Sequence, residues 1–180
     1  MASSDFFLSA VGSQKSNDVA CLSFGLSDRV TAFFSMRQVQ ELVSISSQQI
    51  TPMPNMPSCV LGLLTRRSRV MWLVDLSHML LDAPMPTNCL SYSVVVVRVP
   101  LGPQDSGALM TAVHSQALLG LAVPTTKGVI RVAPERIQPP QGNFPPMLQD
   151  CLRGSLLQDD EMLLALDAEA IATSTVIQVR

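Results

Sequence analysis

The stretch TPMPNMPSCVLGLLTRRSRVMWLVDL, residues 51–76, gathers side chains that could bind a metal or an anion. Met53, Met56 and Cys59 carry sulfur atoms of the soft kind that binds copper(I). No fourth soft ligand is nearby, and a chain with 10 methionines is expected to place two of them close together. Packing is therefore the favoured interpretation, and we expect no metal site.

The arginine cluster Arg66, Arg67 and Arg69 allows three interpretations. It could contact nucleic acid, form a solvated turn, or bind a protein partner through the planar guanidinium groups. An intramolecular role is also open. If QVQELVSI is a strand, Glu41 lies on an apolar face and needs a cation, which the arginine-bearing tip could supply.

Catalytic motifs are weak in this sequence. Serine, histidine and aspartate all occur, but there is no G-x-S-x-G elbow, and neither His78 nor His114 has an evident partner. A hydrolase stays as an alternative. Phosphate-binding glycine loops are missing, so we expect no cofactor. The run Asp159–Glu161 is better interpreted as a solvated turn than as a cation site.

Composition narrows the class of protein. With 47% hydrophobic and 14% charged residues, the chain is expected to be globular. Its net charge of -2 and 4% aromatic content disfavour nucleic-acid binding. The uncharged stretch 106–126 has an apolar core shorter than the roughly 20 residues of a membrane span. We expect no membrane insertion and no signal peptide.

The cysteines suggest a cellular location. Cys21, Cys59, Cys89 and Cys151 form no C-x-x-C pair, so their spacing gives no support for zinc. We interpret them as free thiols in a reducing compartment and expect a cytoplasmic protein.

The elements that position these residues are predicted to be β-strands. Alternation in VACLSFGL, a polar turn and VTAFFSM predict a first hairpin. QVQELVSI is ambiguous between helix and strand; as a strand it places Val39, Glu41, Val43 and Ile45 on one side. TPMPNMP predicts a rigid, extended crossing, and VLGLL and RVMWLVDL a second hairpin. SHMLL after Asp75 and AEAIA after Asp167 each predict a short helical stretch.

The second half of the sequence repeats this order. YSVVVVRV, ALMTAV and ALLGLAV predict strands; GVIRVAPERIQP aligns with ELVSISSQQITP, and LRGSLLQDDEMLLALD with LGLLTRRSRVMWLVD. Gly62 precedes Asp75 by the same number of residues as Gly154 precedes Asp167. We therefore predict a degenerate repeat over 19–82 and 90–173, after a flexible arm at 1–17. The fold predicted is all-β, with two five-stranded barrels and a few short helices, whether or not the barrels exchange strands.

These segments, in this order over about residues 18–173, resemble the CheW family of chemotaxis adaptor proteins. MPNMP…GLL…RSRV…VDL is most similar to CheW-like adaptors of cyanobacterial phototaxis and type IV pilus systems. The resemblance implies a single CheW-like domain over 18–180, with two SH3-like barrel subdomains and no catalysis. It implies two partners, the regulatory domain of a CheA-type histidine kinase and the signalling tip of a methyl-accepting receptor. The receptor would bind in a groove between the subdomains, which ties the protein to membrane receptor arrays.

The resemblance also implies site residues. Arg67 takes the position of the family arginine, Glu41 that of the family glutamate with which it is thought to pair, and Gly62 that of the glycine before the hairpin. Ser68 replaces a turn glycine, which puts a tight turn with positive φ in doubt. The expected partner-binding residues are Glu41, Ser58, Val60, Gly62, Arg66 and Arg67. An SH3-like module for nucleic acid or a small ligand stays as the alternative.

Overall fold

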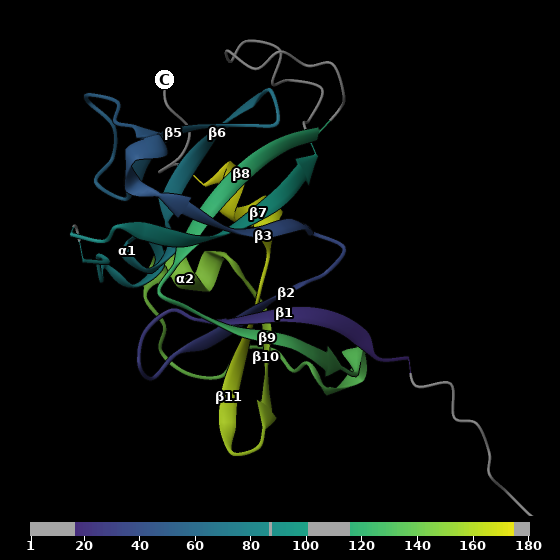
Figure 1. The fold of residues 1–180 in the computed structure, drawn as a ribbon. Helices are drawn as coiled ribbons and strands as arrows, with labels where there is room; N and C mark the ends of the chain where they lie inside the picture. Colours follow the sequence, from purple (N-terminus) through teal and green to yellow (C-terminus); the bar gives the residue numbers. More distant parts are fainter. Residues whose placement is uncertain (1–16, 87, 101–115, 175–180) are drawn as a thin grey trace, which may run out of the picture.

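The computed structural model describes residues 17–86, 88–100 and 116–174. These residues form two β-sheets, each curled into a small barrel, with three short α-helices between and beside them (Figure 1). The all-β prediction with two barrels is confirmed, but one sheet has six strands rather than the expected five, because the short segment Ile50–Thr51 adds a strand. The strand expected at 108–113, and all but the last residue of the expected N-terminal arm, lie outside the described residues.

The lower barrel in Figure 1, here called barrel A, is a five-stranded sheet with the order β10-β11-β2-β1-β9. Neighbouring strands are antiparallel except β11 and β2, which are parallel. Its strands are β1 (Val19–Gly25), β2 (Thr31–Ser35), β9 (Thr125–Val132), β10 (Leu152–Gln158) and β11 (Glu161–Leu166).

The upper barrel, barrel B, is a six-stranded sheet with the order β3-β7-β8-β6-β5-β4, in which β6 and β8 are the parallel pair. QVQELVSI is a strand here, so its period-2 pattern prevails over the helical alternative. The strands are β3 (Val39–Ser46), β4 (Ile50–Thr51), β5 (Val60–Arg66), β6 (Arg69–Asp75), β7 (Ser91–Pro100) and β8 (Gln116–Val123).

The two repeats exchange hairpins. The β1–β2 hairpin of the first repeat joins β9, β10 and β11 of the second in barrel A. Reciprocally, β7 and β8 of the second repeat join β3 to β6 of the first in barrel B. Neither barrel is therefore built from one continuous half of the chain.

Gly62 and Gly154, which the predicted alignment of the two halves matches, make similar close contacts. A Cβ on Gly62 would lie 2.3 Å from the Thr51 carbonyl oxygen, and a Cβ on Gly154 would lie 2.6 Å from that of Gln138. Both glycines are thus required by the close approach of a neighbouring backbone segment, which is β4 at Gly62 and the bridge residue Gln138 at Gly154.

The aspartates that end β6 and β11 are equivalent in the same way. Asp75 caps α1 (Leu76–Leu81) by accepting a hydrogen bond from the backbone amide of His78. Asp167 caps α3 (Ala168–Thr173) by accepting one from the backbone amide of Glu169. Both helices were predicted from SHMLL and AEAIA. The helix α2 (Pro146–Asp150) and the 3-10 turns Ser47–Gln49 and Pro134–Arg136 were not, because each is too short to show a helical period.

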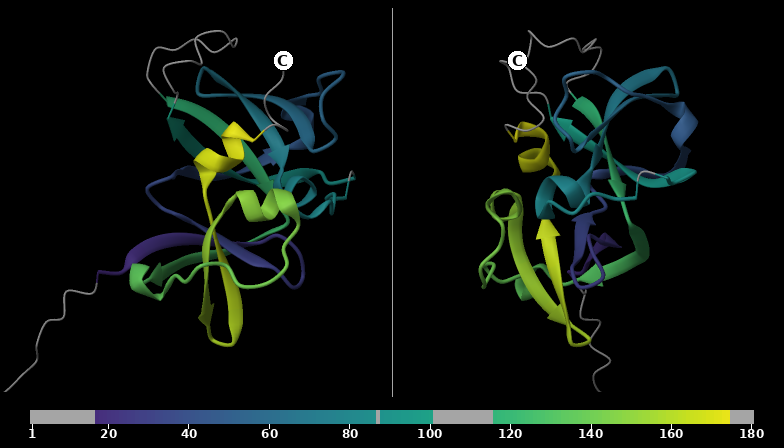
Figure 2. Two further views of the ribbon diagram at one scale, coloured as in Figure 1. Left: turned by 180° about the vertical axis from the view of Figure 1, so that it is seen from behind. Right: turned by 90° about the vertical axis from the view of Figure 1, so that its left-hand side faces the viewer.

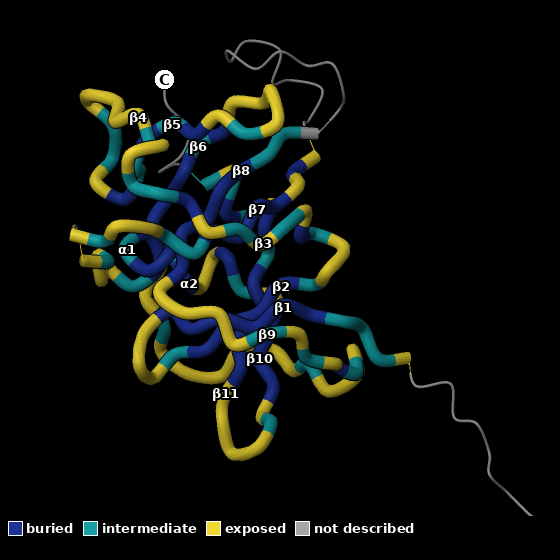
Figure 3. Tube along the Cα trace, viewed as in Figure 1, coloured by how far each residue is buried: buried dark blue, intermediate teal, exposed yellow. Residues whose placement is uncertain are grey.

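The main hydrophobic core lies between the barrels and takes side chains from both sheets and all three helices. Figure 3 shows buried chain running continuously through this middle region, while the hairpin tips are exposed. In the two further views, α1 and α2 lie beside each other where the sheets meet (Figure 2). Smaller clusters fill each barrel. The barrels are therefore joined by their shared core as well as by their strands.

Candidate partner-binding surface

The arginine cluster lies at the tip of the β5–β6 hairpin. Arg66 pairs with Arg69 across the hairpin, and the two residues between them turn the chain. Arg67 and Ser68 have φ angles of 48° and 62°, as a type I′ turn requires. The tight turn that the missing glycine put in doubt therefore forms without it.

Glu41 is held mainly by Arg66, which differs from the expected pairing with Arg67. The Nε and a terminal nitrogen of Arg66 donate to the two Glu41 carboxylate oxygens at 2.8 and 3.2 Å. Arg67 approaches the same carboxylate at 3.3 Å, but its side chain is 72% exposed. The reason is strand alternation: Arg66 shares the inward face of β5 with Leu64, whereas Arg67 lies in the turn.

This contact changes the ionisation of both groups. The hydrogen bond from Arg66 lowers the pKa of Glu41, although burial opposes the shift, and the same bond raises the pKa of Arg66. Glu41 lies on β3 at one end of the sheet order, and Arg66 on β5 near the other end. The ion pair therefore bridges the two ends of the sheet and helps to close barrel B.

Barrel A has a corresponding pair with the charges reversed. Lys127 on β9 donates to Glu161 at the base of the β10–β11 turn, at 2.5 Å, and Thr31 also donates to this carboxylate. The hydrogen bond from Lys127 is the main reason why the pKa of Glu161 is lowered. The predicted solvated turn is confirmed at Asp159 and Asp160, whereas Glu161 forms the ion pair with Lys127. One hairpin tip is thus basic and the other acidic, at opposite ends of the molecule (Figure 1).

The six expected partner-binding residues form two groups. Glu41, Arg66 and Arg67 lie at the basic tip. Ser58 and Val60 lie at the start of β5, and six residues of extended strand from Val60 to Arg66 span roughly 20 Å. Val60 packs against the core between the barrels, and Gly62 crosses β4. The structure does not bring all six together.

Ser58 and His78 form a polar contact that does not have the geometry of a catalytic triad. His78 Nε2 lies 3.3 Å from Ser58 Oγ and 3.7 Å from the Asp82 carboxylate. In a triad the serine and the carboxylate contact opposite ring nitrogens, whereas here both lie nearest the same one. His114 lies outside the described residues.

The sulfur-rich segment before β5 is divided between surface and core. Met53 is 40% exposed, whereas Cys59 is buried in the core between the barrels, and burial raises the pKa of its thiol. A thiolate ligand for copper is therefore disfavoured at Cys59. All four cysteines are free thiols. Among the residues that the structure describes, no helix is long and apolar enough to cross a membrane.

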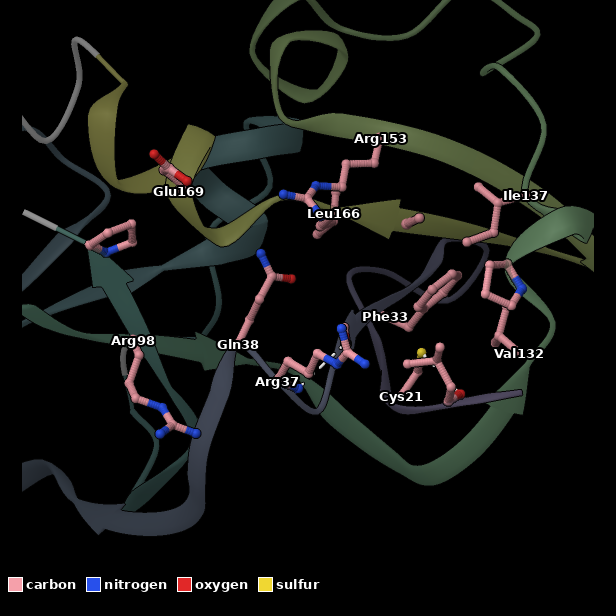
Figure 4. A pocket seen from close by; sticks show the side chains of 15 residues that line it. Cys21, Phe33, Arg37, Gln38, Arg98, Val132, Ile137, Arg153, Leu166 and Glu169 are labelled. Carbon is pink, nitrogen blue, oxygen red and sulfur yellow. Dashed lines mark hydrogen bonds between the residues drawn. The ribbon is translucent and has the colours of Figure 1, made fainter. Parts of the chain in front are cut away.

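A cavity of about 520 Å³ lies at one end of barrel A, beside β7 and α3 (Figure 4). None of the six expected residues lines it. Its polar lining comes from four separate segments of the chain, so no local motif could have revealed it. Those side chains are Ser35, Arg37, Gln38, Arg98, Arg153 and Glu169.

Two barrels that exchange hairpins define the class of protein, an all-β double barrel. The chain belongs to the CheW-like domain family, whose model matches residues 20–176. Its fold is similar to that of the scaffolding protein TtCheW from Thermoanaerobacter tengcongensis, with a TM-score of 0.68 and 18% identity. That match covers 88% of this chain and 90% of the other. No curated protein matches the sequence.

Proposed function

We propose that this protein is a non-enzymatic adaptor that couples methyl-accepting receptors to a CheA-type histidine kinase in a bacterial motility pathway. The observation that carries the proposal is the CheW-like domain match over nearly the whole described chain, 20–176. The structural match to a scaffolding protein along 88% of the chain supports it. The protein would act in the cytoplasm and reach membrane receptor arrays through its partners.

Coupling requires two contacts at once, and the shape of the molecule suits this. The two hairpin tips lie at opposite ends and carry opposite charge (Figure 2). Partners held at two such surfaces would be kept close together, which raises the effective concentration of the kinase beside its receptor. No chemical step is needed for this function.

We place one partner contact at the basic tip. Arg67 is mostly exposed, and Arg69 also faces solvent. The ion pair between Arg66 and Glu41 lies beside them at the same tip. Planar guanidinium groups on a rigid two-residue turn are suited to binding carboxylates of a partner protein. Ser58 and Val60, at the other end of β5, belong to a separate part of the proposed surface.

The test is capture of a purified CheA regulatory domain and of a receptor signalling-tip fragment by the immobilised full chain. We expect Arg67→Glu to weaken capture of at least one partner about tenfold or more, as for a charge reversal within a contact. Arg29→Glu, at an exposed turn away from this tip, is the matched control. Capture of neither partner by the unmodified chain would overturn the proposal.

The narrower expectation of a phototaxis or type IV pilus system rests on the sequence similarity of residues 53–76 and is part of the proposal. Its test is the genomic neighbourhood: pilus genes and a CheA-type kinase gene beside this one would support it. Flagellar genes there would instead favour a chemotaxis system.

A further inference from the structure

The cavity at the end of barrel A combines an apolar wall with a cationic rim. Cys21, Phe33 and Val132 are buried residues of barrel A that line it together with Ile137. In Figure 4 the Arg37 guanidinium and the Gln38 amide extend into the open space in front of this wall. The cavity can therefore take an apolar group and bind a polar one at its mouth.

The rim carries an excess of positive charge. Three arginines and one glutamate line the cavity, and Arg153 is already paired with Asp167 at 2.8 Å. Among the described residues, Arg37 and Arg98 form no ion pair, and both are exposed. An occupant with a carboxylate next to bulky apolar side chains would complement this arrangement.

We propose that the occupant is residues 5–8 of the same chain, Asp-Phe-Phe-Leu. This segment places a carboxylate directly before three large apolar side chains and contains two of the six phenylalanines in the chain. Left in water, those side chains would expose apolar surface, which is unfavourable. In the cavity, they would cover Phe33 and Ile137 while Asp5 reaches Arg37 or Arg98.

The point of attachment makes this docking feasible. Strand β1 begins at Val19, which itself lines the cavity. The eleven residues from Leu8 to Val19 can span at most about 36–40 Å, which is enough to turn back onto the cavity. A second hollow next to it, lined by Asn17, Val19, Met36 and Arg37, offers a path for the returning chain. Because the segment is tethered, it would compete with any external ligand for the cavity.

The experiment is methyl NMR on the full chain with labelled isoleucine, valine and phenylalanine. We expect nuclear Overhauser contacts from the Phe6 or Phe7 ring to the methyl groups of Ile137 or Val132. Phe6→Ser/Phe7→Ser should abolish them, whereas Val11→Ser should not. Unchanged methyl shifts of Val95 and Val97, in the core between the barrels, will show that each variant is folded.

The charge part of the proposal is tested in the same spectra. Arg37→Glu should weaken the contacts by reversing the charge at the rim, and Arg29→Glu should leave them unchanged. Absence of contacts in the unmodified chain overturns the proposal, as does insensitivity to the double change Arg37→Glu/Arg98→Glu. Contacts seen only between differently labelled chains in a mixed sample also overturn it, because the occupant would then be a second copy.

Discussion

Glu41 and Arg66 show how one inward-facing charge can be used to close a small barrel. The carboxylate is placed by β3 and the guanidinium by β5. Their hydrogen bonds join the strand at one end of the sheet order to the strand next to the other end. The neighbouring Arg67 forms a longer ion pair with the same carboxylate, and most of its side-chain surface is exposed. The two arginines thus have separable roles, one within the barrel and one towards solvent.

The ion pair predicts a pH dependence of stability. Because the folded-state pKa of Glu41 lies below its ordinary value of 4.5, the pair stabilises the fold above about that pH. This stabilisation is lost as the pH falls through the folded-state pKa. Glu41→Gln should therefore lower the thermal midpoint at pH 7, and the difference from the unmodified chain should shrink in acid. Scanning calorimetry from pH 7 to about pH 3 will measure it.

Glu135→Gln is the control for this titration, since Glu135 is exposed and forms no ion pair among the described residues. Its midpoint should follow that of the unmodified chain at every pH. A Glu41→Gln difference that grows in acid would contradict the assignment.

Gly62 tests the close crossing of β4 and β5. A methyl group there would lie 2.3 Å from the Thr51 carbonyl oxygen, and φ is 143°, so Gly62→Ala should cost about 3 kcal/mol of unfolding free energy. Gly128→Ala is the matched control, because φ is 107° but no atom lies within 4 Å of the new methyl group. It should cost only about 1 kcal/mol. Equal losses in urea unfolding would refute the steric explanation.

At the scale of elements, the two-residue turns explain both hairpin tips. Arg67 and Ser68, like Asp159 and Asp160, adopt positive φ angles without glycine. Such conformations cost about 1 kcal/mol or more for residues other than glycine. The hairpins hold them because their strand pairing leaves only two residues to reverse the chain.

Ser68→Gly should therefore raise the unfolding free energy, by about 0.5–1 kcal/mol after the greater chain entropy of glycine is subtracted. Ser44→Gly, at an exposed position within β3, should lower it instead. Chemical denaturation of the two variants will distinguish them. Destabilisation of similar size in both would show that the turn is not strained at Ser68.

The strands were predictable from sequence because alternation, turn residues and the equal spacing of Gly62–Asp75 and Gly154–Asp167 all reflect local geometry. The arginine that pairs with Glu41 could not be predicted from the sequence, because it depends on which of two adjacent arginines faces inward at the end of β5. Strand exchange was equally hidden: the pattern of β1 and β2 is the same whether they join β3 or β9. The cavity was missed because its arginines meet only after the barrels have formed.

At the scale of the molecule, the exchange of hairpins makes the barrels interdependent. Barrel A lacks β1 and β2 if the first repeat is removed, and barrel B lacks β7 and β8 if the second is removed. We therefore propose that residues 18–180 fold as one cooperative domain.

A break in the chain near residue 87 tests this cooperativity. Fragments 1–86 and 88–180 should each be unfolded alone, because each loses the strands that complete both barrels. When mixed, they should assemble into one folded complex. Amide proton NMR of the separate and mixed fragments is the measurement. A dispersed, native-like spectrum from either fragment alone would show that a repeat is an independent unit.

The central claim is that one molecule holds a receptor and a kinase at the same time. Analytical ultracentrifugation of the full chain with a CheA regulatory domain and a receptor signalling-tip fragment is the measurement. If the protein is an adaptor, we expect a ternary species that contains all three components and is lost when this chain is omitted. If the two partners bind only in mutually exclusive binary complexes, or bind each other equally well without this chain, the adaptor account is contradicted.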